Sequence, residues 1–246
     1  MSELSGKVAL VTGGSRGIGA AIVRKLASLG ADVALTYASA KDRAEDVAAG
    51  VTALGRRGLT INADNADAGA VVGAVDRTVD ELGRLDILVN NAGIFPYGVI
   101  DEVTLEEVDR TLAVHTRAVY VASQAALRHM ASGGRIVSIG STLAERVPYP
   151  GVALYSMSKS ALIGFTRGLA RDVGERGITV NLVHPGSTNT EMNPEDGPTA
   201  DDERALTALG RYGSPDDIAA TVAHLVGPGG ANITGATFTV DGGANA

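Results

Sequence analysis

The sequence predicts an α/β fold in which buried parallel strands alternate with helices. An apolar run at 8–11 is followed by a Gly-rich turn and then by a helical pattern that ends at Gly30. The same succession repeats along the chain, and unbroken apolar runs are typical of strands buried on both faces. The 32 Gly among 246 residues favour a fold with many tight turns between strand and helix. Residues 1–246 contain no obvious linker, and their number fits one large α/β domain or two small ones.

The expected elements follow one another without an obvious linker. Each expected strand is a short run rich in Val, Ile and Leu: 8–11, 33–37, 59–62, 85–89, 135–141, 177–183 and 236–240. Most expected helices repeat apolar residues every three or four positions, and 40–54 is a more polar one: 20–30, 40–54, 68–82, 104–130, 155–174 and 215–226. The polar and acidic segment of about 187–212 has little core pattern and is expected to form a short, mobile lid.

Charge and composition exclude several classes of function. The net charge is −7, from 21 basic and 28 acidic residues, which argues against nucleic acid as the main partner. The chain has no Cys, and its four His residues show no metal-ligand spacing, so no metal is expected. No apolar run approaches the roughly 18 residues of a membrane span, and the N-terminus carries no long apolar segment. We expect a cytoplasmic protein that binds neither membrane nor nucleic acid.

The turn Thr12-Gly13-Gly14-Ser15-Arg16-Gly17-Ile18-Gly19 follows the first strand and opens the first helix. Glycines let a backbone approach a pyrophosphate, and a helix N-terminus supplies free N–H groups. The spacing is Gly-x-x-x-Gly-x-Gly rather than the standard Gly-x-Gly-x-x-Gly. This context favours a dinucleotide site over a Gly-rich turn without a ligand.

The end of the second strand bears on the choice of cofactor. Sites that prefer NAD hold the ribose 2′-OH with a carboxylate near this point, but the residues here are Thr36 and Tyr37. Arg16 and the loop with Ser39 and Lys41 could meet a 2′-phosphate instead, which favours NADP(H) over NAD(H). The alternative is that these basic side chains are simply solvated.

Two further strand ends should face the same ligand. Asp64 could accept a hydrogen bond from an adenine amino group, and the small residues of Asn90-Asn91-Ala92-Gly93 would let a cofactor lie against the backbone. Open α/β sheets bind ligands at the carboxyl ends of their strands.

Tyr155 and Lys159 lie one helical turn apart, and Ser141 ends the strand before them. A free Tyr has a pKa of about 10, and a nearby ammonium would lower it towards the working pH. Ser141 could then orient a substrate oxygen against the phenol. The alternative reading is an amphipathic helix with a buried Tyr and a Lys whose stem covers apolar surface.

These motifs stand in one order on matching elements, and over residues 5–243 the chain resembles a classical short-chain dehydrogenase/reductase. The subgroup that it resembles most is the 3-oxoacyl-(acyl-carrier-protein) reductase-like one. Pro185-Gly186-x-x-x-Thr190 and the C-terminal Val240-Asp241-Gly242-Gly243 also match. The resemblance implies a single Rossmann-like, doubly wound domain with seven parallel strands and a homotetramer. It also implies hydride transfer between nicotinamide C4 and a carbonyl carbon.

The resemblance also assigns roles to residues. Tyr155 would be the acid/base, Ser141 would orient the carbonyl, and Lys159 would hold the nicotinamide ribose and lower the phenol pKa. The expected cofactor-binding residues are Gly13, Ser15, Arg16, Gly17, Ile18, Gly19, Tyr37, Ser39, Asp64, Asn65, Asn91, Ala92, Gly93, Tyr155, Lys159, Pro185, Gly186, Thr188 and Thr190.

One departure from the family lies at His115, where members usually carry an Asn that helps hold a water of a proton relay. A ring nitrogen could replace that Asn, or the backbone carbonyl alone could hold the water. The replacement could instead slow the relay, or His115 could be an ordinary satisfied helix residue. A smaller departure is Asn65, where an apolar residue is common.

The expected substrate pocket is apolar to aromatic and suits a medium-sized ketone: Phe95, Tyr97, Leu143, Ala144, Val147, Tyr149 and Met192. Acidic residues of the lid would repel an acidic carrier protein, which favours a free carbonyl compound. Three hypotheses follow: an NADP(H)-dependent carbonyl reductase, the 3-oxoacyl-(acyl-carrier-protein) reductase of fatty-acid synthesis, and a catalytically weakened nucleotide-binding or regulatory relative.

Overall fold

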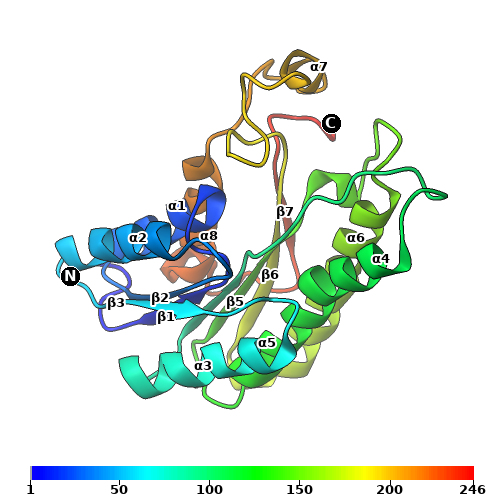
Figure 1. Cartoon of the computed structure of the whole chain (residues 1–246). Helices are drawn as coiled ribbons and strands as arrows, with labels where there is room; N and C mark the ends of the chain where they lie inside the picture. The colour runs from blue at the N-terminus through cyan, green and yellow to red at the C-terminus, as the bar shows by residue number, and fades with distance from the viewer. Residues whose placement is uncertain (1) are drawn as a thin grey trace.

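The computed structural model describes residues 2–246 and contains one seven-stranded sheet in the order β3-β2-β1-β4-β5-β6-β7 (Figure 1). Every neighbouring pair of strands is parallel. The strands are β1 (Val8–Val11), β2 (Asp32–Tyr37), β3 (Gly58–Asn62), β4 (Ile87–Asn90), β5 (Arg135–Ile139), β6 (Thr179–Pro185) and β7 (Thr237–Val240). The predicted doubly wound, Rossmann-like sheet of seven parallel strands is confirmed.

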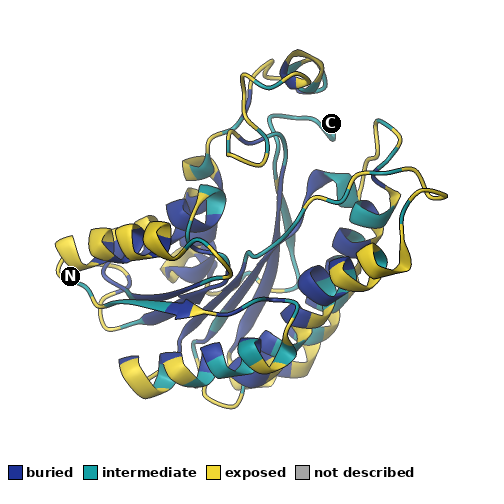
Figure 2. Cartoon of the chain, in the orientation of Figure 1, coloured by how far each residue is buried: buried dark blue, intermediate teal, exposed yellow. Residues whose placement is uncertain are grey.

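Helices cover both faces of the sheet. Figure 1 shows α1, α2 and α8 on one side and α3, α5 and α6 on the other. The helices are α1 (Gly17–Ser28), α2 (Lys41–Ala53), α3 (Ala68–Leu82), α4 (Leu105–Leu112), α5 (Ala118–Ala126), α6 (Ala153–Val173), α7 (Ala200–Ala205) and α8 (Pro215–Val226). The strands between these layers are mostly buried, as Figure 2 shows. No helix within residues 2–246 is long and apolar enough to cross a membrane.

Alternation along β1 explains why its sequence is apolar throughout. Ala9 and Val11 pack into the cluster that contains α1, α2 and α8, whereas Val8 and Leu10 pack into the cluster on the opposite face. Successive side chains of a strand point to opposite faces, so a sheet covered on both sides needs apolar residues at every position.

The strand order reverses between β1 and β4, and this reversal creates the site. Thr12 Oγ1 accepts hydrogen bonds from the backbone N–H of Asn91 at 3.0 Å and of Ala92 at 3.1 Å. The Asn91 side-chain amide donates to the carbonyl oxygens of Thr12 at 2.9 Å and Gly13 at 3.0 Å. These bonds fix the Gly-rich turn against the end of β4, at the switch point where open α/β sheets bind ligands.

The predicted helix over 104–130 is interrupted. A π-helical turn at Ala113–Arg117 separates α4 from α5, and α5 ends at Ala126. Apolar spacing did not reveal the break because a π turn inserts a single residue and the apolar pattern resumes after it. The turn matters for the site because it contains His115.

Other boundaries differ by a few residues. Strand β5 ends at Ile139 rather than 141, and β6 covers Thr179–Pro185 rather than 177–183. The predicted lid segment is not devoid of structure, since it contains α7 and the buried residues Ala200 and Tyr212. Figure 1 shows α7 beyond the carboxyl ends of the strands, near the C-terminus.

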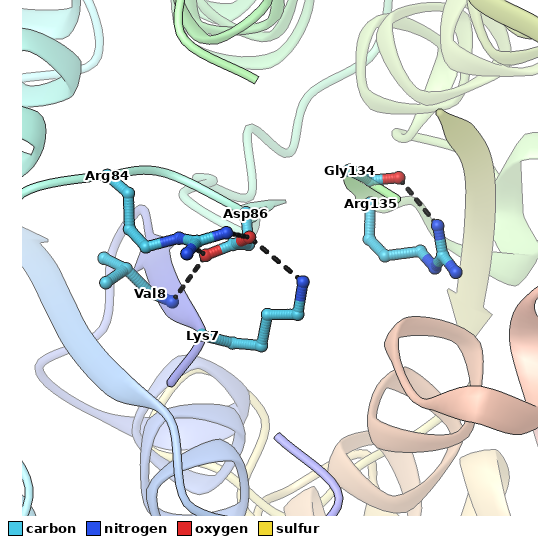
Figure 3. A network of polar contacts seen from close by, with 6 residues as sticks. All are labelled: Lys7, Val8, Arg84, Asp86, Gly134 and Arg135. Carbon is cyan, nitrogen blue, oxygen red and sulfur yellow. Dashed lines mark hydrogen bonds and ion pairs between the residues drawn. The ribbon is translucent and has the colours of Figure 1, made fainter. Parts of the chain in front are cut away.

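A charged cluster ties together the amino ends of β1 and β4, at the end of the sheet opposite the site (Figure 3). The Asp86 carboxylate accepts hydrogen bonds from the Arg84 guanidinium at 2.7 Å, the Val8 N–H at 3.0 Å and Lys7 Nζ at 3.2 Å. Burial acts to raise the pKa of Asp86, but these hydrogen bonds and the Lys7 charge outweigh it and lower the pKa. The network therefore stabilises the fold while Asp86 is ionised.

Candidate active site

A cavity of about 940 Å³ opens at the carboxyl ends of the strands. Its wall is formed by the Gly-rich turn, the ends of β2, β4 and β5, the start of α6 and the segment after β6. All the cofactor-binding residues that the family resemblance implies line this cavity, as do Ser141, Phe95, Tyr97, Leu143, Tyr149 and Met192. His115, which we expect in the place of the usual Asn, is absent from the wall.

The Gly-rich turn forms a cradle that fits a pyrophosphate. Helix α1 begins at Gly17, so its first backbone N–H groups lie at the cavity wall. Gly17 has a φ of +51° and Gly13 has a φ of +64°, a region that favours glycine. A Cβ on Gly13 would lie 2.9 Å from the Ala92 Cα, so only glycine lets the turn pack this closely on β4.

The region expected to hold the nucleotide's ribose contains Arg16, Tyr37 and Ser39 in the cavity wall. Lys41, which we grouped with Ser39, is absent from the wall and instead pairs with Glu45 at 3.6 Å. The carboxylate of Asp64 also lines the cavity, 3.6 Å from the Arg110 guanidinium.

Helix α6 brings Lys159 behind Tyr155. Lys159 Nζ lies 5.8 Å from the centroid of the Tyr155 ring and donates to the Ile139 carbonyl at 3.0 Å. Ser141 follows β5, and its Oγ accepts from the Leu143 N–H at 3.1 Å. Because that bond occupies a lone pair, the hydroxyl hydrogen of Ser141 is left to be donated into the cavity.

Burial sets the protonation states of the two titratable groups. It raises the pKa of Tyr155 to about 12, although the Ser141 hydroxyl acts to lower it. Burial lowers the pKa of Lys159 to about 8. Desolvation of the phenolate, assisted by Tyr149, thus acts opposite to the lowering of the phenol pKa that we expect from Lys159. Tyr155 keeps its proton at neutral pH, which suits a proton donor to a carbonyl oxygen.

His115 is a buried residue of the π-helical turn, and both of its ring nitrogens have partners. Nε2 accepts from the Ile94 N–H at 2.9 Å, and Nδ1 lies 2.8 Å from Ser158 Oγ. The Ser158 hydroxyl donates to the Tyr155 carbonyl at 2.7 Å, so Nδ1 must carry the hydrogen that it donates to Ser158. Burial, assisted by the Lys159 charge, lowers the pKa of His115 to about 3.

This hydrogen-bond pattern bears on one role considered for His115, that of a ring nitrogen which holds the relay water, and leaves the backbone carbonyl available for that water. A neutral ring with both nitrogens engaged has no free atom to hold a relay water, so substitution of the usual Asn by a ring nitrogen is excluded. His115 instead anchors the backbone after β4 to the helix that carries Tyr155.

The sequence did not reveal several residues of the wall: Ile94, Arg110, Val114, Leu206, Ala244 and Asn245. Arg146 donates to the Ala244 carbonyl, and the Asn245 amide donates to Glu145 Oε2 at 3.4 Å. These contacts join segments about a hundred residues apart, so local patterns carried no signal for them. Ala144 and Val147, which we also expected in the substrate pocket, are absent from the wall.

Tyr149 is a polar residue of the predicted substrate pocket that lies close to Glu203 and Tyr97. Burial raises its pKa, and Glu203 and Tyr97 act in the same direction. The lid segment thus places a carboxylate at the pocket. The described residues contain no group of three or more His, Cys, Asp or Glu side chains that could hold a metal ion.

Three comparisons relate the chain to known proteins. The family model described as Enoyl-(Acyl carrier protein) reductase matches residues 13–245. A short chain dehydrogenase from Burkholderia cenocepacia J2315, solved in complex with NADP, is 61% identical with a TM-score of 0.98, and 99% of this chain and 100% of that chain are covered.

Two other similar proteins carry names that do not mention a dehydrogenase. A blue fluorescent protein from a metagenomic library, solved in complex with NADPH, is 54% identical with a TM-score of 0.98, over 99% of this chain and 100% of that chain. The cyclic-di-GMP-binding biofilm dispersal mediator protein of Escherichia coli (strain K12) is 46% identical over 98% of both chains.

Proposed function

Because the chain belongs to the classical short-chain dehydrogenase/reductase family, we propose that it is an NADP(H)-dependent oxidoreductase that interconverts a ketone and a secondary alcohol. The observation that carries the proposal is the meeting of Ser141, Tyr155 and Lys159 in the cavity that also contains the Gly-rich cradle. A proton donor and a dinucleotide site in one cavity are what carbonyl reduction by hydride transfer requires.

NADP(H) is the cofactor, in preference to NAD(H). The similar proteins from Burkholderia cenocepacia and from a metagenomic library were solved with NADP and NADPH. In this chain β2 ends without a carboxylate, and both Tyr37 at its end and Arg16 line the cavity. A guanidinium can bind a 2′-phosphate with two hydrogen bonds, whereas a carboxylate would repel it. In this cavity bound NADPH would supply the hydride that the carbonyl carbon accepts and would itself be oxidised to NADP⁺.

In the reductive direction Tyr155 donates its proton to the carbonyl oxygen while the C=O π bond breaks. Ser141 donates a hydrogen bond to the same oxygen, since its own lone pair is held by Leu143 N–H at 3.1 Å. Lys159, held through the Ile139 carbonyl, offers positive charge to the phenolate that remains. Tyr155 regains a proton from solvent, and the reverse steps oxidise an alcohol.

The substrate is a medium-sized free ketone. Phe95, Tyr97, Leu143, Tyr149 and Met192 give the pocket an apolar to aromatic wall. Two acidic residues of the lid segment, 202 and 203, line the same cavity and would repel an acidic carrier protein. The runner-up is a 3-oxoacyl-(acyl-carrier-protein) reductase, with which the description of the family model shares the acyl carrier protein but not the reaction.

A second class of function is favoured by one relative. The Escherichia coli protein named as cyclic-di-GMP-binding suggests that this cavity binds a cyclic dinucleotide. Arg16, Arg110 and Arg146 line the wall and could contact phosphates. A regulatory nucleotide-binding protein of this kind would not need turnover.

We also propose a cytoplasmic homotetramer. Exposed apolar side chains on α4, α5 and α6 supply a surface for a second copy, with Leu105 81%, Tyr120 57% and Met157 52% exposed. Light scattering after size-exclusion chromatography tests the assembly, and a monomer would refute it.

The function is tested with a panel of ketones and alcohols followed by NADPH absorbance, with NADH as the control. We expect NADPH oxidation with several medium-sized ketones. Titration with cyclic-di-GMP, with and without NADPH, tests the regulatory alternative. Binding of cyclic-di-GMP without turnover of any ketone would contradict the enzyme proposal and support the alternative.

A further inference from the structure

His184 is a fully buried residue of β6 that no step above uses. Its ring lies directly behind the serine of the site: Nδ1 accepts a hydrogen bond from the Ser141 backbone N–H at 2.9 Å. The ring fills the space beside Gly140, where a side chain would collide with it. Ring and turn are therefore packed together, and the position of Ser141 depends on His184.

The hydrogen-bond pattern fixes the state of the ring. A backbone N–H can only donate, so Nδ1 carries a lone pair and the ring hydrogen is on Nε2. Nε2 is buried without a hydrogen-bond partner, and Glu145 Oε1 lies 4.0 Å away, beyond hydrogen-bond reach. Burial, with the Lys159 charge, lowers the pKa of His184 to about 4, so the ring is neutral under ordinary conditions.

Ser141 is held at two points, and His184 supplies one of them. The Leu143 N–H binds its Oγ at 3.1 Å, and His184 binds its backbone N–H at 2.9 Å. Together the two bonds fix the backbone and the oxygen of Ser141, and its hydroxyl hydrogen remains free to be donated to a substrate. Without the Nδ1 acceptor, the backbone N–H would be buried and unpaired, and the turn would shift to find another partner.

We infer that His184 is a positioning residue that acts through Ser141, holding its backbone so that its hydroxyl meets the carbonyl oxygen of a bound ketone. This role rests on the proposed reductase function. It accounts for a buried imidazole that does not line the cavity and whose Nε2 has no hydrogen-bond partner. It also explains why residue 140 is glycine, since a Cβ there would collide with the His184 ring.

Three substitutions test the inference. His184→Leu keeps a similar volume but removes the acceptor, whereas the Asn side-chain oxygen in His184→Asn can replace Nδ1. Thr179→Val is the control, because it removes a buried polar group from the same strand without touching Ser141. If His184→Leu does not fold, His184→Ala takes its place with the same expectation.

We expect His184→Leu to lower kcat by about 10–100-fold, the effect of a misplaced catalytic group, with NADPH affinity unchanged. We expect His184→Asn and Thr179→Val to stay near the wild type. In a Ser141→Ala background, His184→Leu should have no further effect on kcat, because residues that act through one another are not additive. A merely structural role would make the two losses add.

Hydrogen–deuterium exchange of the peptide that contains Ser141 gives a readout that needs no turnover. We expect faster exchange in His184→Leu than in the wild type, and recovery in His184→Asn. If the wild type reduces ketones but His184→Leu keeps its kcat or its slow exchange, the inference is wrong and the proposed function stands. If no ketone is reduced, the proposed function fails, and equal exchange in all variants would overturn the role of His184 as well.

Discussion

His115→Asn separates a structural role of this residue from a role in proton transfer. The ring accepts the Ile94 N–H at 2.9 Å and donates to Ser158 at 2.8 Å, and it is 1% exposed. The shorter Asn cannot span both partners. Leaving one buried backbone donor unpaired costs about 1–3 kcal/mol of unfolding free energy. For a chain of this size, that cost corresponds to a fall in Tm of about 2–12 °C.

Catalysis should be affected much less. Since neither ring nitrogen of His115 is free to hold a relay water, we expect kcat to stay within about threefold of the wild type, a change of less than about 0.7 kcal/mol in the barrier. Differential scanning fluorimetry gives the Tm. NADPH turnover, measured at a temperature where the variant is folded, gives kcat. His129→Asn is the matched control, since His129 is an exposed histidine paired with Asp76 at 3.2 Å.

An unchanged Tm together with a large fall in kcat would refute this reasoning. It would show that the ring takes part in catalysis directly and that its hydrogen bonds to Ile94 and Ser158 contribute little to stability.

Three more predictions concern charge. Asp86→Asn should lower the unfolding free energy by about 1–3 kcal/mol at neutral pH, with exposed Asp80→Asn as the control. Because the pKa of Asp86 is lowered in the fold from 3.8, its contribution is present above that value and is lost as the pH falls through the folded-state pKa. Denaturation curves at several pH values would contradict this if wild type and variant differed equally throughout. The kcat/KM for NADPH should fall as the pH rises through about 8, where buried Lys159 loses its proton. A Lys159→Arg variant that retains activity should not show this fall. A flat wild-type pH profile would be evidence against a role of the ammonium. Arg16→Ala should weaken NADPH binding by more than about tenfold, or 1.4 kcal/mol, and leave NADH binding unchanged. Lys41→Ala should change neither affinity. Fluorescence titration measures both, and equal wild-type affinity for NADH and NADPH would contradict a contact between Arg16 and the 2′-phosphate.

The fold was largely predictable because short local sequence patterns mark its strands and its glycine turns. Residues 8–11 must face apolar layers on both sides, and Gly13 and Gly17 must adopt positive φ, so both leave a clear trace in the sequence. The pairing of Tyr155 and Lys159 was predictable for the same reason, since both lie on one helix. Their predicted roles stay predictions until turnover is measured.

What could not be predicted depends on tertiary contacts. The shift in the pKa of Tyr155 arises from burial, which the spacing to Lys159 does not reveal. The partners of His115 come from a strand end and from α6, and the partner of His184 comes from the end of β5. In each case, the chemical state of the residue follows from groups distant in sequence.

The most direct test of the account is NADPH turnover by Tyr155→Phe with a ketone that the wild type reduces. The substitution removes only the phenolic hydroxyl from a ring packed edge-on against Phe95, with 4.9 Å between centroids, so the fold should be retained. We predict a loss in kcat of at least about 100-fold, the usual contribution of a general acid. A Tyr155→Phe variant that turns over NADPH as fast as the wild type would contradict the claim that this hydroxyl supplies the proton.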